Sequence, residues 1–344
     1  IIKEKKMGKN IVNIALFGLG RIGQMHAENL LSHPRFNLIY VYDLNKKLSK
    51  KMSTKFKCAN LENPNIAMKD GKIDVIFIAT STSTHLKFIT EAVKNKKVVF
   101  CEKPLDLNTK KIEKCKNIIK KYNPKIQIGF NRRYDPGHNL LKKNLLKGKI
   151  GKLEKIIITS RDPAPPSLKY LKTSGGIFKD MMIHDFDLAR YYAGRDEFES
   201  IFATGSNLHD KKFNKIKDFE LASCVLKTKK GIQCIITNSR HCSFGYDQRI
   251  ELFGTKGMLI SDNKRETETK IYSGNSTNNK SKFLNFFIER YSEAYKLQLN
   301  DLFKMFSKKN KPLANFEDGR KSLALAQKAM ESIKSKKFEK IKLI

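Results

Sequence analysis

Two side chains four residues apart, Asp180 and His184, are of the types that an alcohol dehydrogenation requires. Oxidising a secondary alcohol needs a base for the hydroxyl proton while hydride leaves the same carbon, and histidine titrates in the right range. If residues 175–187 begin one helix, this spacing places both side chains on one face, where the carboxylate can orient the imidazole. A helix cap with a structural histidine and a metal site are the alternatives. No third ligand is evident, so we predict no metal.

A second pattern, Gly18-Leu19-Gly20-Arg21-Ile22-Gly23, follows an apolar β-branched run and opens a helix-like segment. This is the context that a dinucleotide-binding glycine turn requires. Gly18 permits the tight turn, Gly20 lets the backbone approach a pyrophosphate, and Gly23 lets the helix pack closely on the strand. The helix N-terminus supplies N–H groups to the anion. The pattern therefore predicts a cofactor site at Gly18, Gly20, Arg21, Ile22 and Gly23.

Asp43 ends the second predicted strand, 20 residues beyond Gly23. A carboxylate here binds both hydroxyls of an adenosine ribose and repels a 2′-phosphate. Leu44 offers no compensating positive charge, whereas Lys46 and Lys47 are close by. The sequence predicts NAD in preference to NADP.

Two further segments, Ala79-Thr80-Ser81 and Cys101-Glu102-Lys103-Pro104, follow later predicted strands. Ligands of an open α/β sheet bind beyond the carboxyl ends of its strands, so both segments should border the cofactor. This places Lys103 better for chemistry than a typical surface lysine, although a surface role is the alternative. The remaining predicted cofactor-site residues are Ala79, Thr80, Ser81, His85, Glu102 and Lys103.

The elements that must position these residues change in character along the chain. In the first 130 residues, strand-like runs alternate with helical periodicity, which predicts a doubly wound parallel sheet of the Rossmann type. The strand-like runs are Ile11–Phe17, Leu38–Tyr42, Val75–Ala79, Val98–Phe100 and Ile126–Phe130, and the helical segments include Ile22–Leu31, His85–Val93 and Lys110–Lys121.

After Arg133, strands follow one another without intervening helices, which predicts an α/β domain with a large, open, mostly antiparallel sheet. We expect a Rossmann domain over 8–132 and a substrate-binding and oligomerisation domain over 133–344, whose C-terminal helices can pack back on the first. The predicted strands are Leu153–Ser160, Ser200–Gly205, Phe219–Lys227, Gly231–Ser239, Gln248–Phe253 and Gly257–Ser261; Ser273–Ser281 is predicted as a loop, and Phe283–Phe306 and Glu317–Ser335 as helices.

Composition restricts the classes of protein. The net charge of +35 suggests nucleic acid, but only 12 of the 69 basic residues are Arg and the lysines are spread along nearly every element. We therefore expect a solvated lysine coat and no nucleic-acid partner. No apolar run approaches the length of a membrane span, no signal peptide is evident, and the six scattered cysteines suit free thiols, so we expect a cytoplasmic protein.

Taken in order, the glycine turn, Glu102-Lys103-Pro104 and Asp180…His184 resemble the glucose–fructose oxidoreductase/inositol dehydrogenase (Gfo/Idh/MocA) family over essentially the whole chain. Within that family the chain looks most like the inositol 2-dehydrogenases. The stretches that carry this closer resemblance are Gly129–Asp135, Arg161–Pro166, Ser174–Asp187, Asn238–Arg240 and Gly245–Arg249.

The resemblance implies NAD-dependent oxidation of myo-inositol to scyllo-inosose in a homo-tetramer. It implies that His184 is the general base, that Asp180 is its partner, and that Lys103 lies beside the nicotinamide and the substrate hydroxyl. Arg132, Asp162 and Tyr246 join Lys103, Asp180 and His184 as substrate-site residues. The alternatives are a dehydrogenase of scyllo-inositol, an aldose or another polyol, and a nucleotide-sensing regulator without catalysis.

Overall fold

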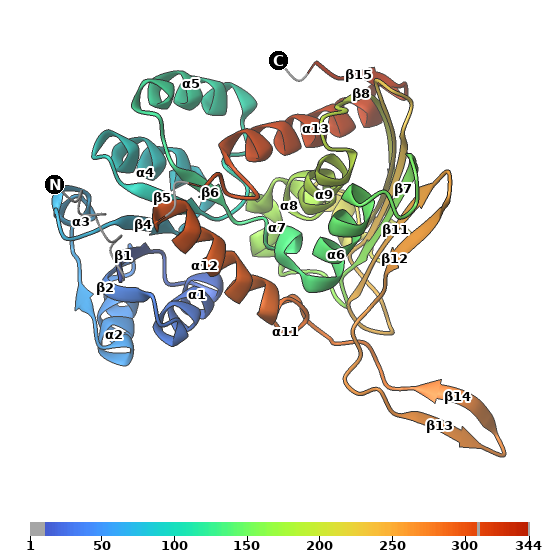
Figure 1. The fold of residues 1–344 in the computed structure, drawn as a ribbon, viewed down its shortest axis with the longest axis horizontal. Coiled ribbons are helices and arrows are strands. Elements are labelled where there is room, and N and C mark those ends of the chain that lie inside the picture. Colours follow the sequence, from blue (N-terminus) through green and yellow to red (C-terminus); the bar gives the residue numbers. More distant parts are fainter. Residues whose placement is uncertain (1–10, 308–309, 343–344) are drawn as a thin grey trace, which may run out of the picture. The chain divides into compact units, whose positions relative to one another are not determined.

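The computed structural model describes residues 11–307 and 310–342, so the predicted domain start at residue 8 lies outside the described residues. The chain divides into two compact units (Figure 1). The first runs to Asn131 and includes Tyr295–Arg320, and the second comprises Arg132–Ala294 and the chain from Lys321 onward. Each unit is described on its own below.

The first unit contains a six-stranded sheet in the order β3-β2-β1-β4-β5-β6, with every neighbouring pair parallel. This confirms the predicted doubly wound sheet. The chain order reverses between β1 and β4, where an open α/β sheet forms its ligand crevice. The strands are β1 (Val12–Phe17), β2 (Phe36–Tyr42), β3 (Ala59–Asn60), β4 (Val75–Ile78), β5 (Val98–Cys101) and β6 (Ile126–Ile128).

Helices connect these strands because the connecting segments carry apolar residues at helical spacing. One further helix comes from far along the chain. In α12 (Ser292–Ser307), Leu299, Leu302 and Met305 are buried in the same core as β1 and β2. The connecting helices are α1 (Arg21–Ser32), α2 (Lys46–Phe56), α3 (Asn65–Lys69), α4 (Thr82–Lys94) and α5 (Thr109–Ile119).

The second unit contains a seven-stranded sheet in the order β12-β11-β7-β10-β9-β8-β15. All its neighbouring pairs are antiparallel except β7 and β10, which confirms the predicted mostly antiparallel sheet. Because β7 and β10 are parallel, their carboxyl ends lie at the same edge of the sheet. The strands are β7 (Leu153–Arg161), β8 (Phe198–Ser206), β9 (Leu221–Thr228), β10 (Gln233–Ser239), β11 (Asp247–Gly254), β12 (Gly257–Ser261) and β15 (Glu339–Lys340).

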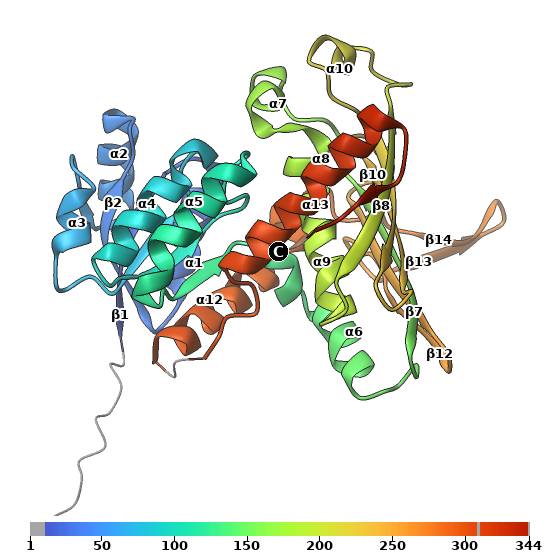
Figure 2. The same ribbon diagram turned by 90° about the horizontal axis from the view of Figure 1, so that it is seen from above.

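Helices α8 and α9 and the C-terminal part of α13 lie on one face of this sheet (Figure 2). The buried core between them includes Phe186, Ile158 and Ile236. The helices of this part of the chain are α6 (Pro136–Leu146), α7 (Leu168–Ser174), α8 (Gly176–Asp180), α9 (Ile183–Ala193), α10 (Lys212–Lys215), α11 (Phe287–Arg290) and α13 (Phe316–Ser335). Among the helices described, none combines the length and apolar character needed to cross a membrane.

Two predicted segments were wrong. Ser273–Ser281 is not a loop, because β13 (Lys270–Ser273) and β14 (Ser276–Lys280) form an antiparallel hairpin that extends from the sheet (Figure 1). Gly274 and Asn275 form its two-residue turn, and backbone pairing does not require apolar side chains. The helix predicted from Phe283 begins only at Phe287 and is interrupted at Tyr291, between α11 and α12.

The helix predicted to carry both Asp180 and His184 is also interrupted. Asp180 ends α8, whereas His184 is the second residue of α9. Between them, the Met182 N–H donates to the Ile177 carbonyl five residues earlier, at 2.8 Å, so the regular helical ladder breaks. A spacing of four therefore does not place the two side chains on one continuous helical face.

Candidate active site in two parts

The glycine turn has the geometry that its sequence predicts. Gly18 has φ +92°, which strongly favours glycine, and a Cβ there would overlap the Ala79 carbonyl oxygen. A Cβ on Gly23 would overlap the Gly18 carbonyl oxygen, so helix α1 packs directly against the turn. Gly20 is the N-cap of α1, and nothing lies within 4 Å of the position of its absent Cβ. The turn therefore leaves open space at a helix N-terminus, as a pyrophosphate requires.

Asp43 lies directly against this turn. Its Oδ2 accepts a hydrogen bond from the Leu19 N–H at 2.7 Å, and its Oδ1 accepts one from the Asn45 N–H at 2.8 Å. The side chain is partly exposed at the end of β2. Because a carboxylate has about four lone-pair sites, both oxygens can still accept from a ribose diol.

His85 connects the two other segments that were predicted to border the cofactor. Its ring nitrogens face two carbonyl oxygens: Nδ1 lies 2.8 Å from that of Pro104 and Nε2 lies 3.0 Å from that of Thr80. The side chain is 1% exposed, and its burial lowers its pKa. His85 therefore holds the loops after β4 and β5 together, and its role is to position these two loops.

Glu102 has a partner that the sequence did not indicate. Its Oε1 lies 2.7 Å from Nε2 of the fully buried His26, and its Oε2 accepts the Lys103 N–H at 3.2 Å. A Cβ on Gly129 would come within 2.7 Å of the same carboxylate. Glu102 is thus fixed between α1 and the end of β6, and it orients the backbone from which the partly buried Lys103 extends.

In the second unit, Asp180 is held by two side chains, one from the preceding helix α7 and one from 60 residues further along the chain. Tyr170 in α7 donates its hydroxyl to Oδ1 at 2.7 Å, and the Arg240 guanidinium lies 3.2 Å from Oδ2. Asp180 is 8% exposed and Arg240 is 1% exposed. Because a buried carboxylate needs a paired charge, Arg240 stabilises Asp180 in its ionised form.

Arg132 is the centre of a second buried cluster. It donates to the carboxylate of Asp185 at 2.7 Å, to Ser160 at 2.9 Å and to the Tyr246 hydroxyl at 3.3 Å. Asp185, on α9, also accepts a hydrogen bond from Asn238 at 2.8 Å. Ser160 and Asn238 stand side by side on the parallel strands β7 and β10, which explains why one carboxylate reaches both.

Asp162 follows β7 and connects the two clusters electrostatically. Burial raises the pKa of its carboxyl to about 6, although Arg240 and Arg132 oppose the rise, and Asp180 adds to it. The structure therefore brings Arg132, Asp162, Asp180 and Tyr246 into one network of charges and hydrogen bonds. His184, in the first turn of α9, is partly exposed and lies one residue before Asp185.

Sequence reasoning missed Tyr170, Arg240 and Asp185. Arg240 had a detectable signal, because Asn238-Ser239-Arg240 ends a strand that could have been paired in parallel with the strand before Asp162. Tyr170 had none, since its contact with Asp180 depends on how α7 packs.

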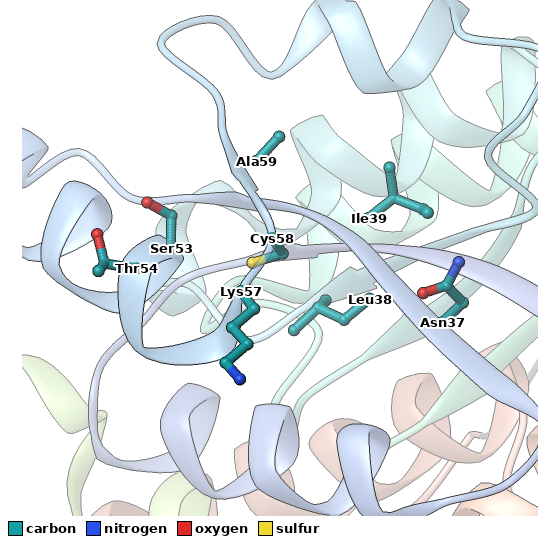
Figure 3. A pocket seen from close by; sticks show the side chains of 8 residues that line it. All are labelled: Asn37, Leu38, Ile39, Ser53, Thr54, Lys57, Cys58 and Ala59. Carbon is teal, nitrogen blue, oxygen red and sulfur yellow. The ribbon is translucent and has the colours of Figure 1, made fainter.

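A hollow of about 510 Å³ on the first unit is not part of this site (Figure 3). It lies beside Asn37–Ile39, in the first half of β2, whereas the glycine turn and Asp43 lie beyond the carboxyl ends of the strands. Cys58 lines it, and burial raises the pKa of this thiol to about 11, so it is a poor nucleophile near neutral pH.

Comparison with known proteins finds a matching family model in each of the two units. Residues 12–130 match the model of an oxidoreductase family with an NAD-binding Rossmann fold, and residues 138–260 match the GFO/IDH/MocA C-terminal domain. A myo-inositol 2-dehydrogenase of Thermotoga maritima is 40% identical over 96% of this chain and 98% of its own length. The chain belongs to the Gfo/Idh/MocA family of oxidoreductases.

Other members of the family are also similar. An inositol 2-dehydrogenase of Rhizobium meliloti is 36% identical over 95% of this chain and 98% of its own. An NAD(+)-dependent scyllo-inositol 2-dehydrogenase of Bacillus subtilis is 33% identical over 84% of both chains.

Two solved structures have the same fold. A putative myo-inositol dehydrogenase of Sinorhizobium meliloti superposes with a TM-score of 0.92 at 35% identity, over 96% of this chain and all of the other. A Lactobacillus casei scyllo-inositol dehydrogenase with bound NAD(H) and scyllo-inositol superposes with a TM-score of 0.89 at 25% identity, over 96% and 99% of the two chains.

Proposed function

We propose that this oxidoreductase oxidises myo-inositol to scyllo-inosose with NAD as the hydride acceptor. The observation that carries the proposal is the buried polar network of the second unit, in which Arg132, Asp162 and Asp180 lie in one electrostatic cluster. A polyol ring presents several hydroxyl groups, and a site that selects it needs closely spaced donors and acceptors rather than apolar walls. The similarity to inositol dehydrogenases supports the same substrate class.

In the proposed mechanism, the glycine turn and Asp43 would hold NAD, which would serve as the hydride acceptor. His184 takes the proton of the reacting hydroxyl as general base. Asp180, fixed by Tyr170 and Arg240, stabilises the imidazolium that forms at His184. The Lys103 ammonium stabilises the developing alkoxide.

The decisive test measures NADH formation by His184→Ala. Loss of a general base lowers turnover by roughly 10²–10⁴-fold, whereas NAD affinity should not change. His33→Ala is the matched control, because His33 is bound to Asn300 in the first unit, away from the proposed chemistry. Wild-type turnover in His184→Ala would remove His184 from the role of base.

We propose NAD rather than NADP because Asp43 would face the ribose. Asp43→Asn keeps an acceptor for the Leu19 N–H but removes the charge that repels a 2′-phosphate. The ratio of kcat/KM for NAD to that for NADP should therefore fall in this variant, since only NADP use is relieved of repulsion. An unchanged ratio would exclude Asp43 as the selecting residue.

A second candidate substrate is scyllo-inositol, which the name of the Bacillus subtilis relative favours. Steady-state rates with myo-inositol, scyllo-inositol and glucose would separate the epimers from an aldose. No NADH formation with any of them, together with intact NAD binding, would favour the nucleotide-sensing regulator.

We also propose a homo-tetramer formed through the sheet face opposite α8 and α9. The exposed side chains of the sheet include Val225, Phe253, Met258 and Ile260, at 42–55% exposure. Light scattering would measure the mass, and Phe253→Lys should dissociate the assembly, because a charge at a buried interface core is costly. A monomeric wild-type protein would exclude this assembly.

A further inference from the structure

Three potential metal ligands that the proposed mechanism does not use converge in the second unit. His209 lies in the connection between β8 and β9, Glu220 lies directly before β9, and His241 lies just after β10. Each offers a ligand atom within 4.8 Å of the other two. Their spacings, 11 and 21 residues, form no sequence motif, so the sequence did not indicate this cluster.

We propose that His209, Glu220 and His241 bind a divalent transition-metal ion such as Zn²⁺. Two imidazoles and one carboxylate suit Zn²⁺, Co²⁺ or Ni²⁺, whereas Ca²⁺ and Mg²⁺ prefer oxygen ligands. Three protein ligands leave a fourth tetrahedral position for water.

The carboxylate is already fixed in place. Glu220 is 1% exposed, and its two oxygens accept the backbone N–H groups of His209 and Asp210. These bonds close the β8–β9 connection onto the carboxylate, and each oxygen keeps a further lone pair for a metal. Glu220 therefore presents a charge whose position does not depend on the metal.

The two imidazoles lie close together, with ring centroids 4.4 Å apart and planes 20° from parallel. Because a ring nitrogen binds a metal in the plane of its ring, one of the stacked rings must turn before both can bind the same ion. Nδ1 of His241 lies 3.4 Å from the Ser239 hydroxyl, the kind of outer contact that fixes the orientation of a metal-bound imidazole. Ligand atoms about 2.0–2.2 Å from a tetrahedral Zn²⁺ lie about 3.3–3.6 Å from one another, whereas here they lie within 4.8 Å, so the site must contract by up to about 1.5 Å. Rotation of the exposed His209 ring can supply this movement.

The site adjoins a residue of the candidate active site. Arg240, between Ser239 and His241, donates its backbone N–H to the Glu220 carbonyl at 2.8 Å and pairs its guanidinium with Asp180. A metal bound by Glu220 and His241 would fix the two segments that hold Arg240. The site is a positioning element for Arg240, and metal binding itself does not depend on the dehydrogenase activity.

The test uses the full chain without a histidine tag, titrated with Co²⁺ and, in parallel, with Zn²⁺ by calorimetry. We expect one equivalent of Co²⁺ to give the intense visible absorption of tetrahedral coordination. Zn²⁺ should displace it and raise Tm, because a ligand that binds only the folded state stabilises it. His209→Ala and His241→Ala should each weaken binding at least tenfold, since loss of even an outer partner costs about 10–100-fold.

Two control variants and a milder ligand variant keep the test decisive. His33→Ala and Cys58→Ser remove other potential ligands, and both should bind like the wild type. His209→Gln removes the imidazole at an exposed position and should weaken binding even if His241→Ala folds poorly. Binding that persists unchanged in His209→Ala and His209→Gln would overturn the proposal, as would the absence of a one-equivalent Co²⁺ signal.

Discussion

Replacing Asp162 by asparagine should make the protein relatively more stable as the pH rises. Burial raises the pKa of Asp162 from 3.8 to about 6 in the folded protein. The folded state thus binds this proton more tightly than the unfolded chain does. The tighter proton binding stabilises the folded protein fully when the pH is below 3.8, the pKa of Asp162 in the unfolded chain. This stabilisation is lost as the pH rises through about 6, the pKa in the folded protein. Asparagine has nearly the same shape and no charge, so Asp162→Asn does not suffer this loss.

The magnitude follows from the two pKa values. A rise of about two pKa units corresponds to about 3 kcal/mol, of which about 2 kcal/mol develops between about pH 4.5 and about pH 7.5. Asp162 is partly exposed, so solvent screens its charge and both free energies are upper limits. For a domain of roughly 150–250 residues, 2 kcal/mol is about 4–8 °C in Tm.

The assay compares thermal unfolding of Asp162→Asn and the wild type, without ligands, over this pH range. The difference in Tm between the variant and the wild type should increase with pH, in favour of the variant, by up to about 4–8 °C. Asp262→Asn, at an exposed carboxylate, is the matched control, and its difference from the wild type should stay nearly constant. A constant difference for Asp162→Asn, or one that favours the wild type at higher pH, would refute the assigned rise in the pKa of Asp162.

Three further outcomes are expected. Gly18→Ala should destabilise the first unit by more than about 1 kcal/mol, because φ is +92° and the new Cβ would overlap Ala79. Gly20→Ala should instead keep the wild-type Tm, because nothing lies near the new Cβ, and calorimetry should show a loss of NAD affinity. Arg132→Met should lower the free energy of unfolding by about 3–5 kcal/mol, because it leaves the fully buried Asp185 without its ion pair. A much smaller loss in denaturant unfolding would show that the hydrogen bonds from Ser160 and Asn238 are enough to stabilise the Asp185 carboxylate. Random-sequence DNA should show no binding at physiological salt in fluorescence anisotropy despite the charge of +35, and submicromolar binding there would contradict the lysine-coat interpretation.

The dinucleotide half of the site could be predicted from sequence because its determinants are local. A left-handed glycine at position 18 and a glycine against the Gly18 carbonyl at position 23 are requirements of one short turn. The alternation of strands and helices likewise follows from apolar periodicity, which each segment carries in its own residues. The hairpin at residues 270–280 had a local signal too, in Gly274-Asn275, but its polar strands concealed it.

The polar half was decided by tertiary structure. Arg240 reaches Asp180 across 60 residues of chain, and Arg132 reaches Tyr246 across 114. No local pattern encodes such pairs, because they depend on β7 and β10 lying parallel with α8 and α9 over the same face. The broken helix between Asp180 and His184 has the same origin, since packing overrode a spacing that looked helical. The sequence alone determined which residue types were available for chemistry, and only the packing of distant segments decided which of them share a charge, a proton or a hydrogen bond.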